Sequence, residues 1–182
     1  PASPGLLPVN MGAAIQALEV SGLVTVDQSL VNHLASVRLT GRLSRIQTED
    51  FELVLDVAHN VESVSQLVQF LTDHPVSGKT AAVFGVMGDK PIHDMLALCE
   101  SAFDEWHLID LCHVSRAMST DRLTEFLKPM GAPIHQGAFA DLWQSLMTRV
   151  TTGDRVVVFG SFFSVGEATP YLAAHYHDGE QN

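Results

Sequence analysis

Apolar residues recur along the chain in two patterns. Short runs rich in β-branched and aromatic residues predict strands, and longer stretches with apolar residues at helical spacing predict helices. The predicted strands are residues 53–57, 81–86, 106–111 and 155–160, with a weaker one near 133–135. Because these strands alternate with helices from residue 81 onward, the pattern predicts an α/β fold with a mostly parallel sheet covered by helices.

The strongest helical pattern covers residues 139–150. Its apolar stripe consists of Phe139, Leu142, Trp143, Leu146, Met147 and Val150. Residues this regular on one helical face are typical of a core, so we do not expect them to form a binding site. A second helix is predicted over residues 61–71, with Asn60 as a suitable N-cap.

The first part of the chain has a different pattern. Two helical segments, 9–20 and 27–37, follow one another without a strand between them. We therefore expect residues 1–37 to be a helical tail of a preceding domain. Residues 38–50, rich in Arg, Thr and Ser, are then the linker into an α/β domain that spans residues 51–182.

Composition excludes several classes of protein. With 46% hydrophobic residues the chain can bury a sizeable core, and its net charge of −11 disfavours binding to nucleic acid or anionic membranes. Arg38, Arg42 and Arg45 lie close together against this negative charge, so they form either a local anion site or a solvated loop. No apolar run approaches the roughly 18 residues of a membrane span, so we expect a cytoplasmic protein.

Metal and disulfide chemistry find little support in the sequence. Cys99 and Cys112 lack the spacing of a zinc site or a disulfide scaffold and are expected to be buried thiols. His59 belongs to a strand end that is considered below. The remaining histidines show no spacing typical of metal ligands, so no metal site is expected in this chain.

Polar residues follow the first predicted strand directly. Asp56, His59 and Asn60 come where the strand ends and the next helix begins. In a parallel sheet the carboxyl ends of the strands lie at one edge, which is where ligands bind. The alternative is structural: a core histidine bonded to a carbonyl and a carboxylate bonded to neighbouring amides.

Two glycine-containing turns end at the same predicted edge. Asp89 and Lys90 follow the second strand, and Ser161 and Ser164 follow the last strong strand. Their polar groups could bind a carboxylate or phosphate, or they could only shape the turns and cap the helices that follow. The dinucleotide pattern G-x-G-x-x-G is absent from both turns.

Five motifs in order resemble those of the bacterial folylpolyglutamate synthase/dihydrofolate synthase family of the Mur ligase superfamily. They are "LPVNMGAAIQAL" (7–18), "GR" (41–42), "LDVAHN" (55–60), "GVMGDK" (85–90) and "DRVVVFGSFFSVGE" (154–167). Two positions depart from the family pattern, since Thr40 and Val61 stand where prolines are usual. Both changes affect backbone stiffness rather than chemistry.

The resemblance implies a Rossmann-like domain that follows the tail of an ATPase domain. Such enzymes transfer the γ-phosphate of ATP to a carboxylate of dihydropteroate or a folate, and the amino group of L-glutamate then attacks the acyl phosphate. The Walker loop and the Mg²⁺ ligands of the family belong to the ATPase domain, so the chain alone is expected to be inactive.

The resemblance also implies two groups of site residues. The ATP-binding group is Asn10, Arg42 and Asp56, with Arg42 on phosphate and Asp56 on the ribose. The glutamate-binding group is His59, Lys90 and Ser161. Two alternatives stay open: a Mur ligase that builds a cell-wall precursor, and a non-catalytic module that binds a nucleotide or an acidic metabolite. The sequence also leaves open whether dihydropteroate, folylpolyglutamate or both receive the glutamate.

Overall fold

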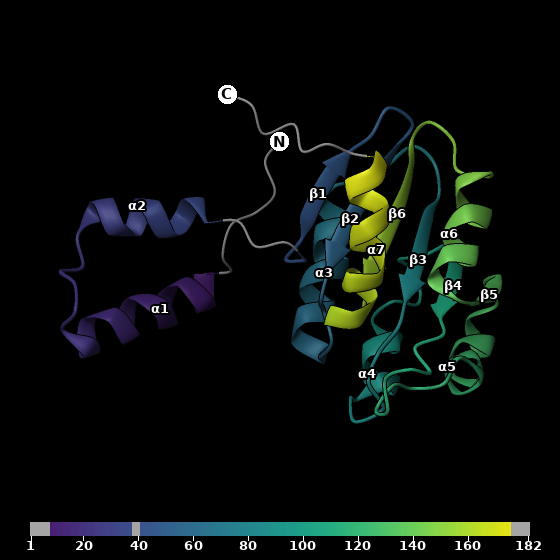
Figure 1. Cartoon of the computed structure of the whole chain (residues 1–182), viewed down its shortest axis with the longest axis horizontal. Helices are drawn as coiled ribbons and strands as arrows, with labels where there is room; N and C mark the ends of the chain where they lie inside the picture. The colour runs from purple at the N-terminus through teal and green to yellow at the C-terminus, as the bar shows by residue number, and fades with distance from the viewer. Residues whose placement is uncertain (1–7, 38–40, 176–182) are drawn as a thin grey trace.

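One mixed sheet forms the centre of the protein. The computed structural model describes residues 8–37 and 41–175, and within them six strands are arranged in the order β1-β2-β6-β3-β4-β5 (Figure 1). Their bounds are β1 Ser44–Gln47, β2 Phe51–Asp56, β3 Thr80–Phe84, β4 Glu105–Ile109, β5 Ile134–Gly137 and β6 Asp154–Phe159. All neighbours pair in parallel except β1, which is antiparallel to β2.

Helices cover both faces of this sheet. One face carries α3 (Val61–Asp73), α4 (Ile92–Ala97) and α5 (Thr120–Leu127), followed by the short 3₁₀ helix η1 (Lys128–Met130). The other face carries α6 (Phe139–Met147) and α7 (Phe162–His175). The predicted α/β fold, with a mostly parallel sheet and helices on both faces, is confirmed.

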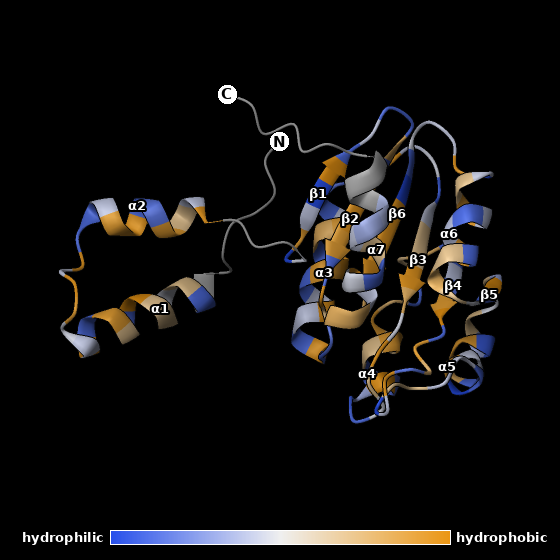
Figure 2. Ribbon diagram, viewed as in Figure 1, coloured by the Kyte–Doolittle hydropathy of each residue, from blue (hydrophilic) through white to orange (hydrophobic). Residues whose placement is uncertain are grey.

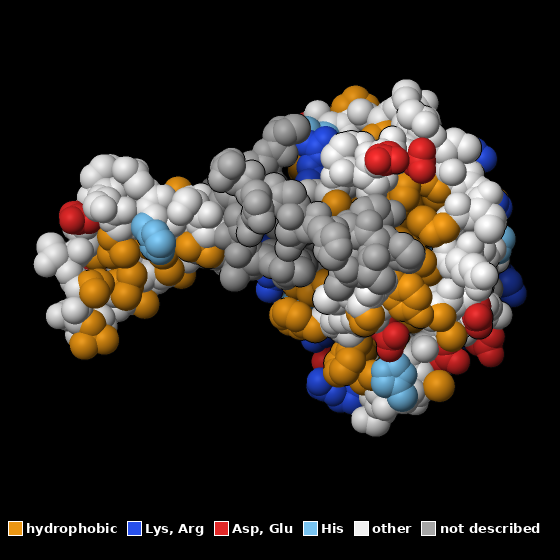
Figure 3. Space-filling view, turned by 45° about the horizontal axis from the view of Figure 1, so that its top comes forward, with side chains coloured by type: hydrophobic (Ala, Val, Ile, Leu, Met, Phe, Trp, Pro, Cys, Tyr) orange, Lys and Arg blue, Asp and Glu red, His pale blue; other side chains and the backbone are white. Residues whose placement is uncertain are grey.

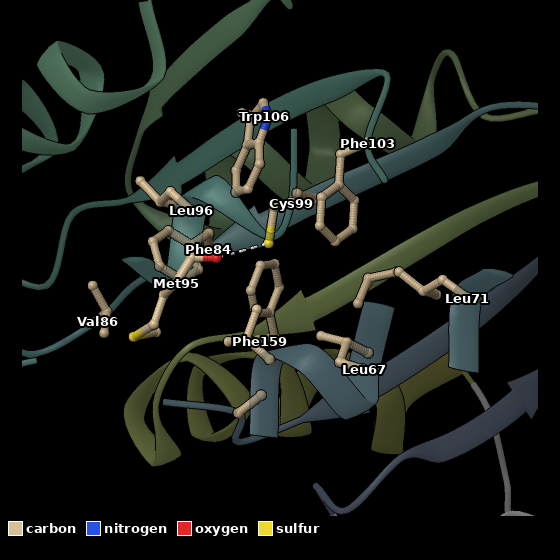
Figure 4. Close-up of a cluster of buried hydrophobic side chains, with 14 of the residues drawn as sticks. Leu67, Leu71, Phe84, Val86, Met95, Leu96, Cys99, Phe103, Trp106 and Phe159 are labelled. Carbon is tan, nitrogen blue, oxygen red and sulfur yellow. Dashed lines mark hydrogen bonds between the residues drawn. The ribbon is translucent and has the colours of Figure 1, made fainter. Parts of the chain in front are cut away.

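Two cores fill the space between the sheet and its helices. Strand residues point alternately to the two faces, so successive residues of one strand enter different cores. Figure 4 shows the first core, in which Phe84, Phe103, Trp106 and Phe159 surround the buried Cys99. The central strands are mostly apolar in colour in Figure 2, as expected for strands covered on both faces.

The two cysteines differ in environment. Burial raises the pKa of the Cys99 thiol to about 12, which makes it an inert core residue. Cys112 is exposed, so its expected burial is wrong. It lies past the end of β4, where the chain has already left the sheet.

The helix predicted over residues 139–150 is α6, which ends earlier than predicted, at Met147; its residues Phe139, Trp143 and Leu146 enter the second core. Asn60 caps α3 as predicted, because its Oδ1 accepts a hydrogen bond from the Ser63 N–H at 2.8 Å.

A buried ion pair joins β2 to β6. Glu52 and Arg155 are register partners, 4% and 2% exposed, and the Arg155 Nε donates to the Glu52 carboxylate. The same guanidinium donates to the carbonyl of His74 at the end of α3, and Arg45 donates to Glu52 from β1. The Glu52 carboxylate therefore connects β1, β2 and β6, and Arg155 extends this network to the end of α3.

The segment predicted as a linker, residues 38–50, contains a strand that the sequence analysis missed. β1 lies at the edge of the sheet, and Ile46 is its one large apolar residue, half-buried. Residues 38–40 lie outside the described ranges, which leaves Arg38 and Thr40 without a structural account.

The helical segments expected at the start of the chain are α1 (Pro8–Ser21) and α2 (Gln28–Ser36). None of the side chains described in these two helices is buried. Val20 and Leu23 are each 83% exposed, and several hydrophobic side chains lie among polar ones on the surface of this part of the molecule in Figure 3. The two helices stand apart from the sheet in Figure 1 and take no part in its cores.

Within the described ranges we find no helix that combines the length and the apolar character required for crossing a bilayer.

Candidate functional site

The candidate site lies at the carboxyl edge of three neighbouring strands. β2, β6 and β3 are adjacent and parallel, so the turns that follow them adjoin one another. Edges of this kind are the usual ligand sites of open α/β sheets because the helices that follow begin there.

A tight turn, residues 41–44, folds onto the end of β2 and fixes Arg42 there. The Val57 N–H donates to the carbonyl of Gly41 at 2.8 Å, and Gly41 has a φ of 77°. The next residue but one, Leu43, has the positive φ of 45°, which is rare for a residue with a side chain. Its N–H donates to the Asp56 Oδ2 at 3.1 Å. Arg42 is thus held between two backbone anchors.

Asp56 is a buried carboxyl in this turn. It is 6% exposed, and its Oδ1 accepts from the Ala58 N–H at 2.8 Å. Burial raises the pKa of Asp56 from 3.8 to about 6, against the opposing effects of two backbone N–H groups and of the charges on Arg42 and His59. The group is therefore mainly a carboxylate at pH 7, and burying this charge lowers the stability of the folded protein.

Within residues 8–37 and 41–175, His59 has a hydrogen-bond partner at one of its two ring nitrogens. Its Nδ1 lies 2.7 Å from the carbonyl of Val57, and a carbonyl can only accept, so Nδ1 carries the hydrogen. In the neutral ring Nε2 is then the atom with a lone pair. The structural alternative, a histidine bonded to a carbonyl, is present here, but it uses only one of the two nitrogens.

Phe162 connects these residues and was missed by the sequence analysis. Its ring is 66% exposed, with the Arg42 guanidinium carbon 5.8 Å from the ring centroid. The His59 ring is also a neighbour of Phe162, with 6.4 Å between the ring centroids and 40° between the ring planes. Two adjacent phenylalanines in a glycine turn after a strand were the available signal, since such a position is seldom buried.

Ser161 and Ser164 are buried and bonded to one another. The Ser164 N–H donates to the Ser161 Oγ at 3.0 Å, so Ser161 acts as a cap at the start of α7. The Ser164 hydroxyl donates to the carbonyl of Gly85 at 2.6 Å, and the two hydroxyls lie 2.9 Å apart. The capping alternative is therefore present for Ser161. The hydrogen bond from Ser164 to Gly85 links the turn after β6 to the turn after β3.

Gly160 allows these two turns to pack closely. It has a φ of 107°, and a Cβ at this position would lie 2.6 Å from the Phe84 ring and 2.7 Å from the carbonyl of Gly85. Both the backbone conformation and the available space therefore require glycine.

The remaining two predicted residues belong to other segments of the chain. Lys90 is half-buried on the turn after β3 and pairs with the exposed Asp89 at 3.3 Å. Asn10 is exposed on α1, which stands apart from the sheet. The structure thus brings together Arg42, Asp56 and His59, adds Phe162, and does not bring Asn10 to this edge.

Among the described residues, this edge does not present a set of metal ligands. Both Asp56 oxygens accept backbone N–H groups. In the described part of the chain, the one group of three carboxylate or imidazole side chains with converging ligand atoms is Glu105, His107 and His135. Two of these residues belong to β4 and one to β5, with Glu105 at the opposite, amino end of β4.

Comparison with known proteins gives a consistent result. Residues 41–162 match the family described as "Mur ligase, glutamate ligase domain". The dihydrofolate synthase/folylpolyglutamate synthase of Escherichia coli K12 is 30% identical over 171 residues, which cover 94% of this chain and 39% of the relative.

Solved structures agree with this match. Escherichia coli FolC in complex with DHPP and ADP has a TM-score of 0.80 at 28% identity, covering 96% of this chain and 41% of that one. A bifunctional folylpolyglutamate synthase/dihydrofolate synthase with Mn, AMPPNP and L-glutamate bound has a TM-score of 0.79 at 30% identity, covering 94% and 41%.

The chain spans about two fifths of the length of these relatives. The family match covers well over half of the chain and includes β1 to β6 together with the turns that carry Arg42, Asp56, His59 and Phe162. The resemblance noted in the sequence is confirmed: the chain belongs to the Mur ligase family and carries its glutamate ligase domain.

Proposed function

We propose that the chain is the C-terminal part of an ATP-dependent ligase that adds L-glutamate to dihydropteroate, to folylpolyglutamate, or to both. One observation carries the proposal: the 41–44 turn, bonded to Asp56 and Val57, holds Arg42 beside Phe162 and His59 at the ligand edge of the sheet. The similarity to enzymes named dihydrofolate synthase/folylpolyglutamate synthase supports it.

The residue types fit a nucleotide and an amino acid. The planar fork of the Arg42 guanidinium suits phosphate oxygens, on which charge increases during phosphoryl transfer. Asp56 still has lone pairs that could accept from the ribose hydroxyls. ATP, when bound, supplies the phosphoryl group that activates the carboxylate of the acceptor.

The incoming glutamate needs different groups. Its amino nitrogen must be deprotonated before it attacks the acyl phosphate, and the lone pair on the His59 Nε2 can accept a hydrogen bond from it. Lys90 can pair with a glutamate carboxylate as a point charge. Ser161 can contribute only an oxygen lone pair, since its hydrogen and one lone pair are used inside the protein.

The same proposal assigns the parts of the chain. Residues 1–37 are the helical tail of the ATPase domain, residues 38–50 the linker, and residues 51–182 the glutamate ligase domain. The unburied side chains of α1 and α2 support this division, because two helices with exposed apolar residues require another body to pack against. Mg²⁺ ligands are assigned to the ATPase domain.

The test uses the full-length protein. We expect ATP-dependent incorporation of radiolabelled L-glutamate into dihydropteroate or folylpolyglutamate. Incorporation into a cell-wall precursor instead would replace the proposal with the cell-wall alternative, and no incorporation into any acceptor would favour a binding module.

A second measurement concerns the 182-residue chain alone. It is expected to be inactive and to bind ATP weakly, because the phosphate-binding loop of the family belongs to the ATPase domain. Micromolar ATP binding by calorimetry would contradict that division of labour.

A further inference from the structure

We propose that the chain binds a divalent transition-metal ion of the Zn²⁺ class through Glu105, His107 and His135. These residues lie on β4 and β5, with Glu105 at the amino end of β4, away from the carboxyl-edge turns that carry Arg42, Asp56 and His59. The inference is therefore independent of the proposed ligase function.

Sheet register brings the three side chains together. His107 and His135 are direct partners across the parallel β4–β5 pair. Glu105 precedes His107 by two residues and so points to the same face of the sheet, the face that α6 covers. The Glu105 Oε1 lies 3.2 Å from the His107 Nε2, and the Glu105 Oε2 lies 4.0 Å from the His135 Nε2.

This set of ligands suits Zn²⁺ or a similar ion. Two imidazoles and one carboxylate form a common three-ligand site that leaves a position for water. Ligand atoms about 2.1 Å from a tetrahedral ion lie roughly 3.4 Å from one another. The three ligand atoms here lie within 4.8 Å of one another, so binding requires them to move closer together and one imidazole to turn.

His135 can make that movement. The two imidazole rings are stacked, with 4.8 Å between centroids and 20° between planes, whereas an ion must lie in the plane of each ring. One ring therefore has to turn. His135 has a 43% exposed side chain on the edge strand, so it can rotate while His107 stays buried.

The hydrogen bonding of His107 is incomplete. The side chain is fully buried, yet its Nδ1 has no hydrogen-bond partner in the described part of the protein. A polar atom buried without a partner costs about 1–3 kcal/mol. When Nε2 binds an ion the ring hydrogen lies on Nδ1, so this cost remains and lowers the affinity of the site.

Arg149 competes for the same carboxylate. Its Nη1 donates to the Glu105 Oε2 at 3.0 Å from just beyond the end of α6, and its side chain is 42% exposed. An ion that engages this oxygen displaces Arg149 into solvent. Removing Arg149 should therefore strengthen metal binding, which a purely structural Glu–Arg–His network does not predict.

The experiment measures metal binding directly. The 182-residue chain is titrated with Zn²⁺ by calorimetry and with Co²⁺, followed by its visible absorption. We expect one equivalent to bind, His135→Gln to weaken binding about tenfold or more, and Arg149→Ala to tighten it. His93→Gln, which changes an 83% exposed histidine beside Asp94, is the matched control and should bind like the wild type.

Because His135 lies at the edge, its variant is expected to fold, and circular dichroism verifies this. Unchanged affinity in folded His135→Gln would overturn the site, as would the absence of Zn²⁺ binding by the wild type in large excess of the ion. Weaker binding in Arg149→Ala would also contradict the proposed competition.

Discussion

Replacing Asp56 by asparagine should remove a pH dependence from the stability of the protein. The Asp56 carboxyl is 6% exposed, and burial raises its pKa from 3.8 to about 6. In the unfolded chain the carboxyl is hydrated and returns to about 3.8. The folded state therefore binds the proton more tightly than the unfolded state does.

The sign and size follow from this difference. The protonated group favours the folded state, so its contribution is fully present below about pH 4 and is lost as pH rises through about 6. A difference of about two pKa units, at roughly 1.4 kcal/mol per unit, corresponds to about 3 kcal/mol. Asparagine does not titrate and should not show this loss.

Urea denaturation of both proteins between pH 4 and pH 8 measures the effect. Acids with lowered pKa values, such as Glu105 and Asp154, make both proteins more stable as pH rises, but they cancel in the difference. Asparagine can accept from only one of the Leu43 and Ala58 N–H groups, so its absolute stability at pH 4 can be lower. Between pH 4 and 7 the variant should gain about 2.4 kcal/mol relative to the wild type, because part of the unfolded carboxyl is already ionised at pH 4.

If the difference in unfolding free energy between the two proteins does not change over this pH range, the raised pKa of Asp56 is refuted. A change in the opposite direction would mean that the two N–H bonds outweigh burial. If the gain is found, the protein retains a carboxylate at a cost to its own stability, which is typical of a group kept for a ligand.

Three further predictions concern the edge and its support. In the full-length enzyme, Arg42→Ala should lower kcat about 10²–10³-fold by removing a phosphate contact, whereas Arg122→Ala, which changes an exposed side chain on α5, should leave kcat unchanged; equal kcat values for the two variants would show that Arg42 makes no such contact. Gly160→Ala should destabilise the protein by about 3 kcal/mol or more, seen as a lower Tm; an unchanged Tm would show that the turn can adjust. Glu52→Ala should cost about 3–5 kcal/mol in urea denaturation because it leaves the Arg155 guanidinium buried without its carboxylate, and a cost below about 1 kcal/mol would contradict this.

Features that depend on near neighbours in the chain could be predicted from the sequence. Asn60 and the apolar spacing after it predict α3, because an N-cap and an amphipathic face act within a few residues of one another. The apolar runs predict the parallel strands for the same reason. Asp56 and His59 could be placed at the ligand edge because both follow a strand in a parallel sheet.

β1 and the site residue Phe162 could be identified only from the tertiary structure. β1 has a single large apolar residue, and its place in the sheet depends on antiparallel pairing with β2. Phe162 gains its role from packing beside Arg42 and His59, residues more than 100 positions earlier in the chain. Neither neighbour is visible from the sequence around Phe162.

The sequence by itself determined most of the strands and helices, apart from β1, and which side chains end at the turns, because those depend on periodicity and on hydrogen bonds between near neighbours. The tertiary structure alone decided which distant groups meet. The pairing of Glu52 with Arg155 follows from β6 lying beside β2, and the pairing of His107 with His135 from the register of β4 and β5. Strand order and register arise from packing across the whole sheet, and no local pattern encodes them.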